Sequence, residues 1–181
     1  DPHTARHCKR VSEISMLIAA QLHISDPETL SDLMVASLLH DIGKLGTPRD
    51  VLFKPQRLTE LEWYIMKNHA SVGEHLIIAS KVPRAHVVGP IVRHTHEHFD
   101  GSGYPDGLSG YDIPLLSRII EVADCFDAIT STRSYRQPLS IRDSVNLLYT
   151  ERGIKHDPDI LLALCVVIEL ERCSDTLDWF D

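Results

Sequence analysis

The sequence has few cysteines, no long apolar run and no excess of basic residues, and these absences exclude several classes of protein. Its four cysteines lie far apart and form no CxxC pair, which disfavours a disulfide framework and a zinc ribbon. No run of about 18 apolar residues occurs and no signal peptide is visible, so we expect a cytoplasmic protein without a membrane segment. Acidic residues outnumber basic ones by 26 to 18, which disfavours a protein that binds nucleic acid polymers.

The length and composition fit one folded domain. The chain has 181 residues, 43% of them hydrophobic, and this is enough to bury a sizeable core. We therefore expect a single domain over residues 1–181. Because the chain opens abruptly with Asp1 rather than Met, we also expect that it starts at a domain boundary and that an N-terminal regulatory domain precedes it.

Apolar residues recur at helical spacing along most of the chain, and strand-like alternation is nowhere sustained. Thr59 followed by Glu62 forms a capping box, Ser140 can cap a later helix, and Gly43 can end a helix in the left-handed conformation. The pattern predicts an all-α bundle of about seven helices, with a core over about 1–135 and C-terminal helices over about 139–173. The predicted helical segments include 3–22, 27–43, 59–69, 83–92, 115–132, 140–152 and 158–170.

A long loop interrupts this helical pattern. It runs from about Phe99 to Leu115 and is rich in glycine, whereas an ordinary connection between helices needs only a handful of residues. A histidine cluster from His94 to His98 precedes the loop, and the apolar run of the next helix follows it. Such a loop beside potential metal ligands indicates a functional site.

Several histidines and carboxylates are candidate metal ligands. His40 and Asp41 end a predicted buried helix, where two consecutive side chains can turn toward one point. His3 and His7 are four residues apart, so both project from one face of a helix. Asp124 interrupts an apolar run, and a metal ion would offset the cost of burying its carboxylate. Each signal taken alone also fits a structural or surface residue, and only their combination favours a metal site.

The combination predicts the kind of metal and the reaction. The remaining candidate ligands are His69, His96 and Glu97. Because the set contains no thiolate, it suits iron, manganese or zinc, and two such ions can activate water against a phosphoester. Lys44, Arg133 and Arg136 lie beside the candidate ligands in sequence and could contact the phosphate, although a solvated helix end would explain them too.

The residues singled out above fall in the order of a known family, and the agreement covers nearly the whole chain. The sequence resembles HD-GYP domains. The motifs that carry the resemblance are His7-x-x-Arg10-Val11, His40-Asp41-Ile42-Gly43-Lys44, Lys54-Pro55, His69-x-x-x-Gly73, His96-Glu97-x-x-Asp100-Gly101-x-Gly103-Tyr104-Pro105, Arg118-Ile119, Val122-Ala123-Asp124-x-Phe126-Asp127-Ala128 and Arg133-x-Tyr135-Arg136.

The resemblance implies an HD-type helical bundle with a long GYP loop and a metal-dependent phosphodiesterase. Such domains open cyclic di-GMP to linear pGpG and, in some members, continue to GMP, usually with iron or manganese. They also dock diguanylate cyclase (GGDEF) domains through the GYP loop.

The family's functional residues carry over to this chain one by one. The implied ligands of the first ion are His7, His40, Asp41 and Asp124. Asp41 would bridge to a second ion held by His69 and His96, and it would act in catalysis with Lys44. The implied substrate contacts are Lys44, Tyr104, Arg133 and Arg136.

Two positions depart from the family pattern. Thr95 stands where a histidine ligand of the second ion is expected, so we expect at most two ions, with the second bound weakly. His94 would point about 200° away from His96 on a continuous helix and would not replace that ligand. His3 occupies the position of a third-ion carboxylate and remains a possible ligand.

Two other readings of the function stay open from the sequence. A degenerate HD-GYP domain could bind a cyclic dinucleotide or a signalling partner without turnover, and Thr95 motivates this alternative. An HD hydrolase could instead act on another nucleotide, including mixed cyclic GMP-AMP.

Several further residues are expected to be structural. Trp63 and Tyr64 are interpreted as packing residues. The histidines without a partner in the motifs are interpreted as surface or capping groups, and these are His23, His75, His86 and His156.

Overall fold

The computed structural model describes the backbone of residues 2–131 and 137–173 and the side chains of residues 4–131 and 137–169. These residues form helices and no strand, which confirms the predicted all-α class. The α-helices are α1 (Pro2–Gln21), α2 (Pro27–Leu39), α3 (Arg49–Leu52), α4 (Glu60–Lys67), α5 (His69–Ala79), α6 (Ala85–Arg93), α7 (Leu115–Thr130), α8 (Ile141–Thr150) and α9 (Pro158–Cys173), with 3-10 helices η1 (Ile42–Gly46) and η2 (Gly110–Asp112).

Local sequence signals explain where several helices begin. The side chain of Asp26 accepts a hydrogen bond from the Thr29 amide and caps α2. The capping box predicted at Thr59 and Glu62 is present at the start of α4. Ser140 accepts from a backbone amide in the first turn of α8, as predicted. These caps satisfy amides that have no partner within their own helix.

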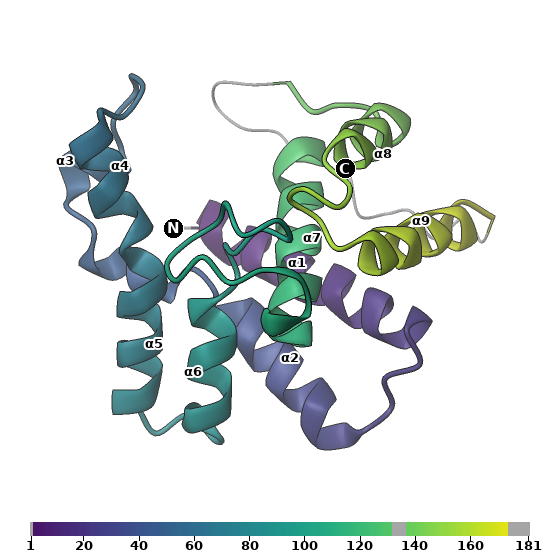
Figure 1. The fold of residues 1–181 in the computed structure, drawn as a ribbon, viewed down its shortest axis with the longest axis horizontal. Coiled ribbons are helices and arrows are strands. Elements are labelled where there is room, and N and C mark those ends of the chain that lie inside the picture. The colour runs from purple at the N-terminus through teal and green to yellow at the C-terminus, as the bar shows by residue number, and fades with distance from the viewer. Residues whose placement is uncertain (1, 132–136, 174–181) are drawn as a thin grey trace.

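The core is organised around α1 and α7, which cross at the centre of the bundle (Figure 1). Val11 and Ile18 of α1 and Ile119 and Ile120 of α7 are fully buried. On one side of this pair α5 and α6 lie side by side, and on the other side α8 and α9 pack against the centre (Figure 1). Of the helices in the part of the chain that the structure describes, none is long and apolar enough to cross a membrane.

The chain around Gly43 differs from the prediction. The helix expected to end at Gly43 ends at Leu39, and Gly43 lies inside η1. A Cβ atom at Gly43 would lie 1.8 Å from the carbonyl oxygen of His69. Glycine is therefore needed there because η1 packs directly on the first turn of α5, and not because it ends a helix.

Two other segments also differ from the predicted pattern. His69 begins α5 instead of ending the preceding helix, and Asn68 caps both the end of α4 and the start of α5. The short helix α3 lies within residues 47–57, which contain two prolines and had the character of a loop. Neither difference changes the architecture.

The long loop is present between α6 and α7 and is fastened to the rest of the bundle. The amide of Phe99 donates to the carbonyl of Lys155 at 3.0 Å, and the amide of Asp100 donates to the carbonyl of Ile154 at 2.8 Å. Gly103 packs so closely on the histidine cluster that a Cβ atom would lie 2.2 Å from the amide nitrogen of His98. These contacts hold the loop over the centre of the molecule.

Candidate metal centre

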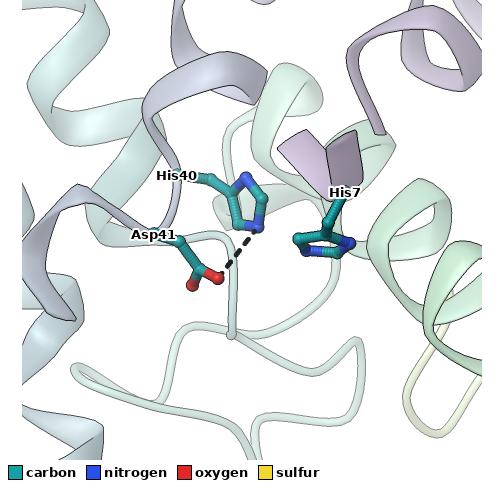
Figure 2. A group of neighbouring side chains, drawn as sticks. All are labelled: His7, His40 and Asp41. Atoms are coloured by element: carbon teal, nitrogen blue, oxygen red, sulfur yellow. Dashed lines mark ion pairs between the residues drawn. The ribbon is translucent and has the colours of Figure 1, made fainter. Parts of the chain in front are cut away.

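The structure brings the predicted ligands together in two groups that share Asp41. His7, His40 and Asp41 form the first group, and Asp41, His69 and His96 form the second; within each, one ligand atom per residue lies within 4.8 Å of the others. Figure 2 shows the first group, in which His40 Nε2 lies 3.7 Å from Asp41 Oδ2. His69 Nε2 lies 3.7 Å from Asp41 Oδ1 on the other side of the same carboxylate. Asp41 is thus placed between two potential ion positions.

Asp124 adds a second carboxylate to the first group. Its Oδ1 atom lies 3.2 Å from His7 Nε2 and 4.0 Å from His40 Nε2. Burial raises the pKa of Asp124, but His7 and His40 lower it further, and the net result is a pKa well below the ordinary value. The carboxylate in the apolar stretch of α7 is therefore ionised.

Backbone carbonyls set the tautomers of His40 and His69. His40 Nδ1 lies 2.7 Å from the carbonyl oxygen of Ser37, and His69 Nδ1 lies 2.7 Å from that of Met66. A carbonyl oxygen only accepts, so each Nδ1 carries the proton and each Nε2 offers a lone pair. His40 Nε2 and Asp41 Oδ1 are buried and have no hydrogen-bond partner among the residues that the structure describes. Rings oriented in this way are typical of metal ligands, and the residues present fit divalent cations.

His96 is the third residue of the second group. Its Nε2 atom lies 2.9 Å from His69 Nε2. Burial, with a contribution from His69, lowers the pKa of His96 to about 3, and burial also lowers the pKa of His69. Both rings are neutral at pH 7 and are available as ligands without loss of a proton.

Arg10 and Asp127, which were not predicted as site residues, support His7. His7 Nδ1 lies 2.7 Å from Asp127 Oδ2, and Arg10 Nη2 donates to the same oxygen at 3.1 Å. Burial lowers the pKa of His7, but Asp124 and Asp127 raise it more, to about 9. A sequence signal did exist, because Arg10 follows His7 by three residues and Asp127 follows Asp124 by three, which places each pair on one helical face.

Lys44 lies at the edge of the centre. Its Nζ atom donates to Asp41 Oδ2 at 2.6 Å. Burial raises the pKa of Asp41, whereas His40 and Lys44 lower it, and the net pKa is about 2. The side chain of Lys44 is 36% exposed, so its positive charge faces both the carboxylate and the solvent.

Other residues near the histidine cluster lie outside the two groups. Thr95 is buried and its hydroxyl donates to the carbonyl of Val92 at 3.0 Å, so it offers no ligand in place of the expected histidine. His94 Nε2 contacts Asp106 at 2.9 Å. Glu97 also lies outside the two groups: its Oε1 atom accepts from the Asp106 amide and holds the loop, and with His94 and Asp106 it forms a separate cluster of potential ligands.

Three predicted site residues cannot be placed. Arg133, Arg136 and the side chain of His3 lie outside the described residues. Their predicted roles stay predictions.

A pocket of about 380 Å³ adjoins the centre. Tyr104 stacks on His96 with ring centroids 5.0 Å apart, and Trp63 meets Tyr104 edge-on at 6.3 Å. Trp63 is 47% exposed and Tyr64 is 71% exposed, so the interpretation as packing residues was wrong for both side chains. The residues that line the pocket are Trp63, Lys67, His96, His98, Ser102, Gly103, Tyr104, Glu121, Asp124, Cys125 and Lys155.

The interpretation of His156 as a surface or capping group was also wrong. Its ring is fully buried, and Nδ1 lies 2.9 Å from Glu121 Oε2. His156 thus holds Glu121, which lines the pocket. This pairing has no local signal in the sequence, because 35 residues separate the two positions.

Comparisons with known proteins identify the family of the chain. Residues 1–160 match the model of the HD domain family. The chain is 41% identical over 164 residues to the cyclic di-GMP phosphodiesterase response regulator RpfG of Xanthomonas campestris, which covers 91% of this chain and 43% of that protein. It is 38% identical over 169 residues to the 3'3'-cGAMP-specific phosphodiesterase 3 of Vibrio cholerae, covering 93% of this chain and 36% of that protein. The chain thus spans less than half the length of these relatives.

A solved structure shows the same fold. The HDG"Y"P protein Bd1817 from Bdellovibrio bacteriovorus superposes with a TM-score of 0.74 at 22% identity, covering 92% of this chain and 52% of that chain. The family match, the relatives and the paired ligand groups all agree with the HD-GYP resemblance of the sequence. The chain therefore belongs to the HD domain family.

Proposed function

We propose that the protein is a metal-dependent phosphodiesterase that hydrolyses cyclic di-GMP to linear pGpG and, in a second step, to GMP. The observation that carries the proposal is the pair of ligand groups that share Asp41, beside a pocket large enough for part of a dinucleotide. The names of the relatives from Xanthomonas campestris and Vibrio cholerae support a cyclic dinucleotide as the substrate.

The donor set supports two divalent cations in the proposed enzyme. His7, His40 and Asp124 would hold one, and His69 and His96 the other, with Asp41 between them. Iron or manganese suits imidazole and carboxylate ligands without a thiolate. Cations bound there would activate a water molecule and stabilise charge on the phosphoester.

The chain's own side chains would orient the substrate. Asp41 and Asp124 are ionised, so each can accept a hydrogen bond from water in the site. Lys44 supplies a positive charge at the edge, where it would stabilise the non-bridging phosphate oxygens. Tyr104 forms one wall of the pocket, and burial raises the pKa of its hydroxyl, which stays protonated as a hydrogen-bond donor. Arg133 and Arg136 are proposed as further phosphate contacts by the family resemblance alone.

Turnover tests this proposal directly. Protein loaded anaerobically with Fe²⁺ or Mn²⁺ should convert cyclic di-GMP to pGpG, as followed by chromatography. The apoprotein prepared with a chelator should be inactive and should recover when the metal is returned. The absence of turnover with either metal would refute the enzymatic proposal.

Thr95 favours a second candidate function, in which the domain binds a cyclic dinucleotide or a GGDEF domain without turnover. Its hydroxyl donates to a backbone carbonyl, so among the described residues the second group has three members and not four. Thr95→His separates the two functions, provided that the variant melts at the same temperature as the parent. Activity that appears only in this variant would favour binding without turnover, and equal activity in both proteins would favour the enzyme.

A further inference from the structure

Part of the pocket lining consists of polar side chains that lie outside the metal centre. Glu121 lies on α7, three residues before Asp124, and therefore on the same helical face and one turn away. Lys155 comes from the connection between α8 and α9, which the amides of Phe99 and Asp100 fasten to the long loop. Glu121 and Lys155 both line the pocket, together with the side chain of Cys125.

Glu121 is held in place but retains hydrogen-bonding capacity. Its Oε2 atom accepts from His156 Nδ1 at 2.9 Å. Within the described part of the chain its Oε1 atom accepts only from the Cys125 thiol, a weak donor, at 3.2 Å. The side chain is 5% exposed, and the exposed part faces the pocket. A carboxylate has about four acceptor sites, so it can receive additional donors from a ligand.

The charges of Glu121 and Lys155 determine which kind of ligand can bind beside them. Glu121, Cys125 and His156 lie close enough to hold a cation, but the ammonium of Lys155 lies beside Cys125 and Glu121 and opposes one. A second phosphate would be repelled by Glu121. A neutral group that offers both donors and an acceptor fits a carboxylate beside an ammonium best.

A nucleobase is such a group, and aromatic side chains of the same pocket can stack on one. Tyr104 and Trp63 present their rings to the pocket. We propose that Glu121 accepts from N1–H and the N2 amino group of a guanine, while Lys155 donates to O6, so that this pair selects guanine in a cyclic dinucleotide. Adenine has an acceptor at N1 and no N2 amino group, so it cannot give two donors to the carboxylate. The inference rests on the proposed function and specifies its substrate.

The test compares three substrates in matched variants. kcat/KM is measured for cyclic di-GMP, cyclic GMP-AMP and cyclic di-AMP with the Mn²⁺-loaded parent, Glu121→Gln and Glu151→Gln. Glu151 is the control because its carboxylate also lies near His156, at 3.3 Å, and it does not line the pocket. Glu121→Gln should lower kcat/KM for cyclic di-GMP about 10- to 100-fold, the usual effect of losing a charged hydrogen bond, and change that for cyclic di-AMP much less.

Defined outcomes overturn the inference. An unchanged ratio of cyclic di-GMP to cyclic di-AMP in Glu121→Gln would do so, as would an equal shift in Glu151→Gln, which would indicate an indirect effect through His156. Loss of one bound metal equivalent in Glu121→Gln would identify a cation site instead. If Glu121→Gln fails to fold, Lys155→Gln tests the same selectivity through O6.

The proposed function can fail separately. If the parent hydrolyses none of the three substrates, the enzymatic proposal fails while the inference remains testable by calorimetry. Glu121→Gln should then bind cyclic di-GMP about 10- to 100-fold more weakly than the parent, with little change for cyclic di-AMP.

Discussion

The two ligand groups that share Asp41 have similar geometry and different charge. The group at His7 and His40 also contains Asp124, and Asp127 stands behind His7. The group at His69 and His96 is neutral except for Asp41 itself, and Thr95 adds nothing to it. A cation gains more from two carboxylates than from one, so the two positions should differ in affinity and in their response to pH.

Removing the carboxylate of Asp41 should have the largest effect on metal binding and turnover, because both groups contain it. Asp41→Ala should abolish binding at both positions and lower kcat/KM by more than the roughly 100-fold that loss of an outer partner causes. Metal analysis and turnover of the same sample measure both effects. Retention of one tightly bound equivalent would mean that the groups are independent.

A substitution that forces η1 away from α5, and so moves the two groups apart, should have the next largest effect. In Gly43→Ala the new Cβ atom would overlap the His69 carbonyl at 1.8 Å, so η1 and α5 must separate. Overpacking of this kind costs about 1–3 kcal/mol, which lowers the melting temperature by roughly 2–4 °C per kcal/mol. Gly46→Ala is the matched control in the same 3-10 helix, because its Cβ atom meets only a Val72 methyl at 3.1 Å. An equal effect of both substitutions would argue against the close packing at Gly43.

Asp127→Asn tests one group alone. It keeps the shape of the side chain but removes the charge that orients His7, and loss of such a partner typically costs 10- to 100-fold in metal affinity. The first ion should weaken by that factor and the second should not change, as measured by competition with a chelator. Asp106→Asn serves as the control, because Asp106 pairs with Arg93 and His94 outside both groups. Equal weakening of both ions would contradict the separation of the groups.

The sequence predicted the helical class, because capping and apolar periodicity are local signals. The motifs also predicted which side chains gather around Asp41. Thr59 and Ser140 are examples of capping, and each caps its helix as expected. Contacts between distant segments were not predictable in this way. The need for glycine at position 43 arises from a helix that begins at His69, and the burial of His156 arises from its pairing with Glu121.

The motif letters located the side chains of the two groups but not the atoms that orient them. Ser37 and Met66 act through backbone carbonyls, which any residue would supply, so the sequence contains no sign of their role. Asp127 was visible as a motif letter, yet its function follows only from its contact with His7. Physical support for a metal ligand is therefore less visible in sequence than the ligand itself.

The smallest expected difference between the two groups is the release of a proton when a metal ion binds. The pKa of His7 is raised to about 9, so at pH 7 the ring carries a proton that a cation must displace. Affinity at the first position should rise about tenfold per pH unit up to about pH 9, whereas the second group, whose histidines have lowered pKa values, should show no such rise above pH 7.

Calorimetry in buffers of different ionisation enthalpy counts these protons, with one expected for the first ion and none for the second. The same pKa sets the stability of the metal-free protein: the raised value stabilises the fold fully below pH 6.5, and the contribution is lost as the pH rises through about 9. His7→Gln should remove both the proton release and this loss of stability. Release of one proton by each ion would show that the groups do not differ in charge, because the contrast requires His69 and His96 to be neutral before metal binds.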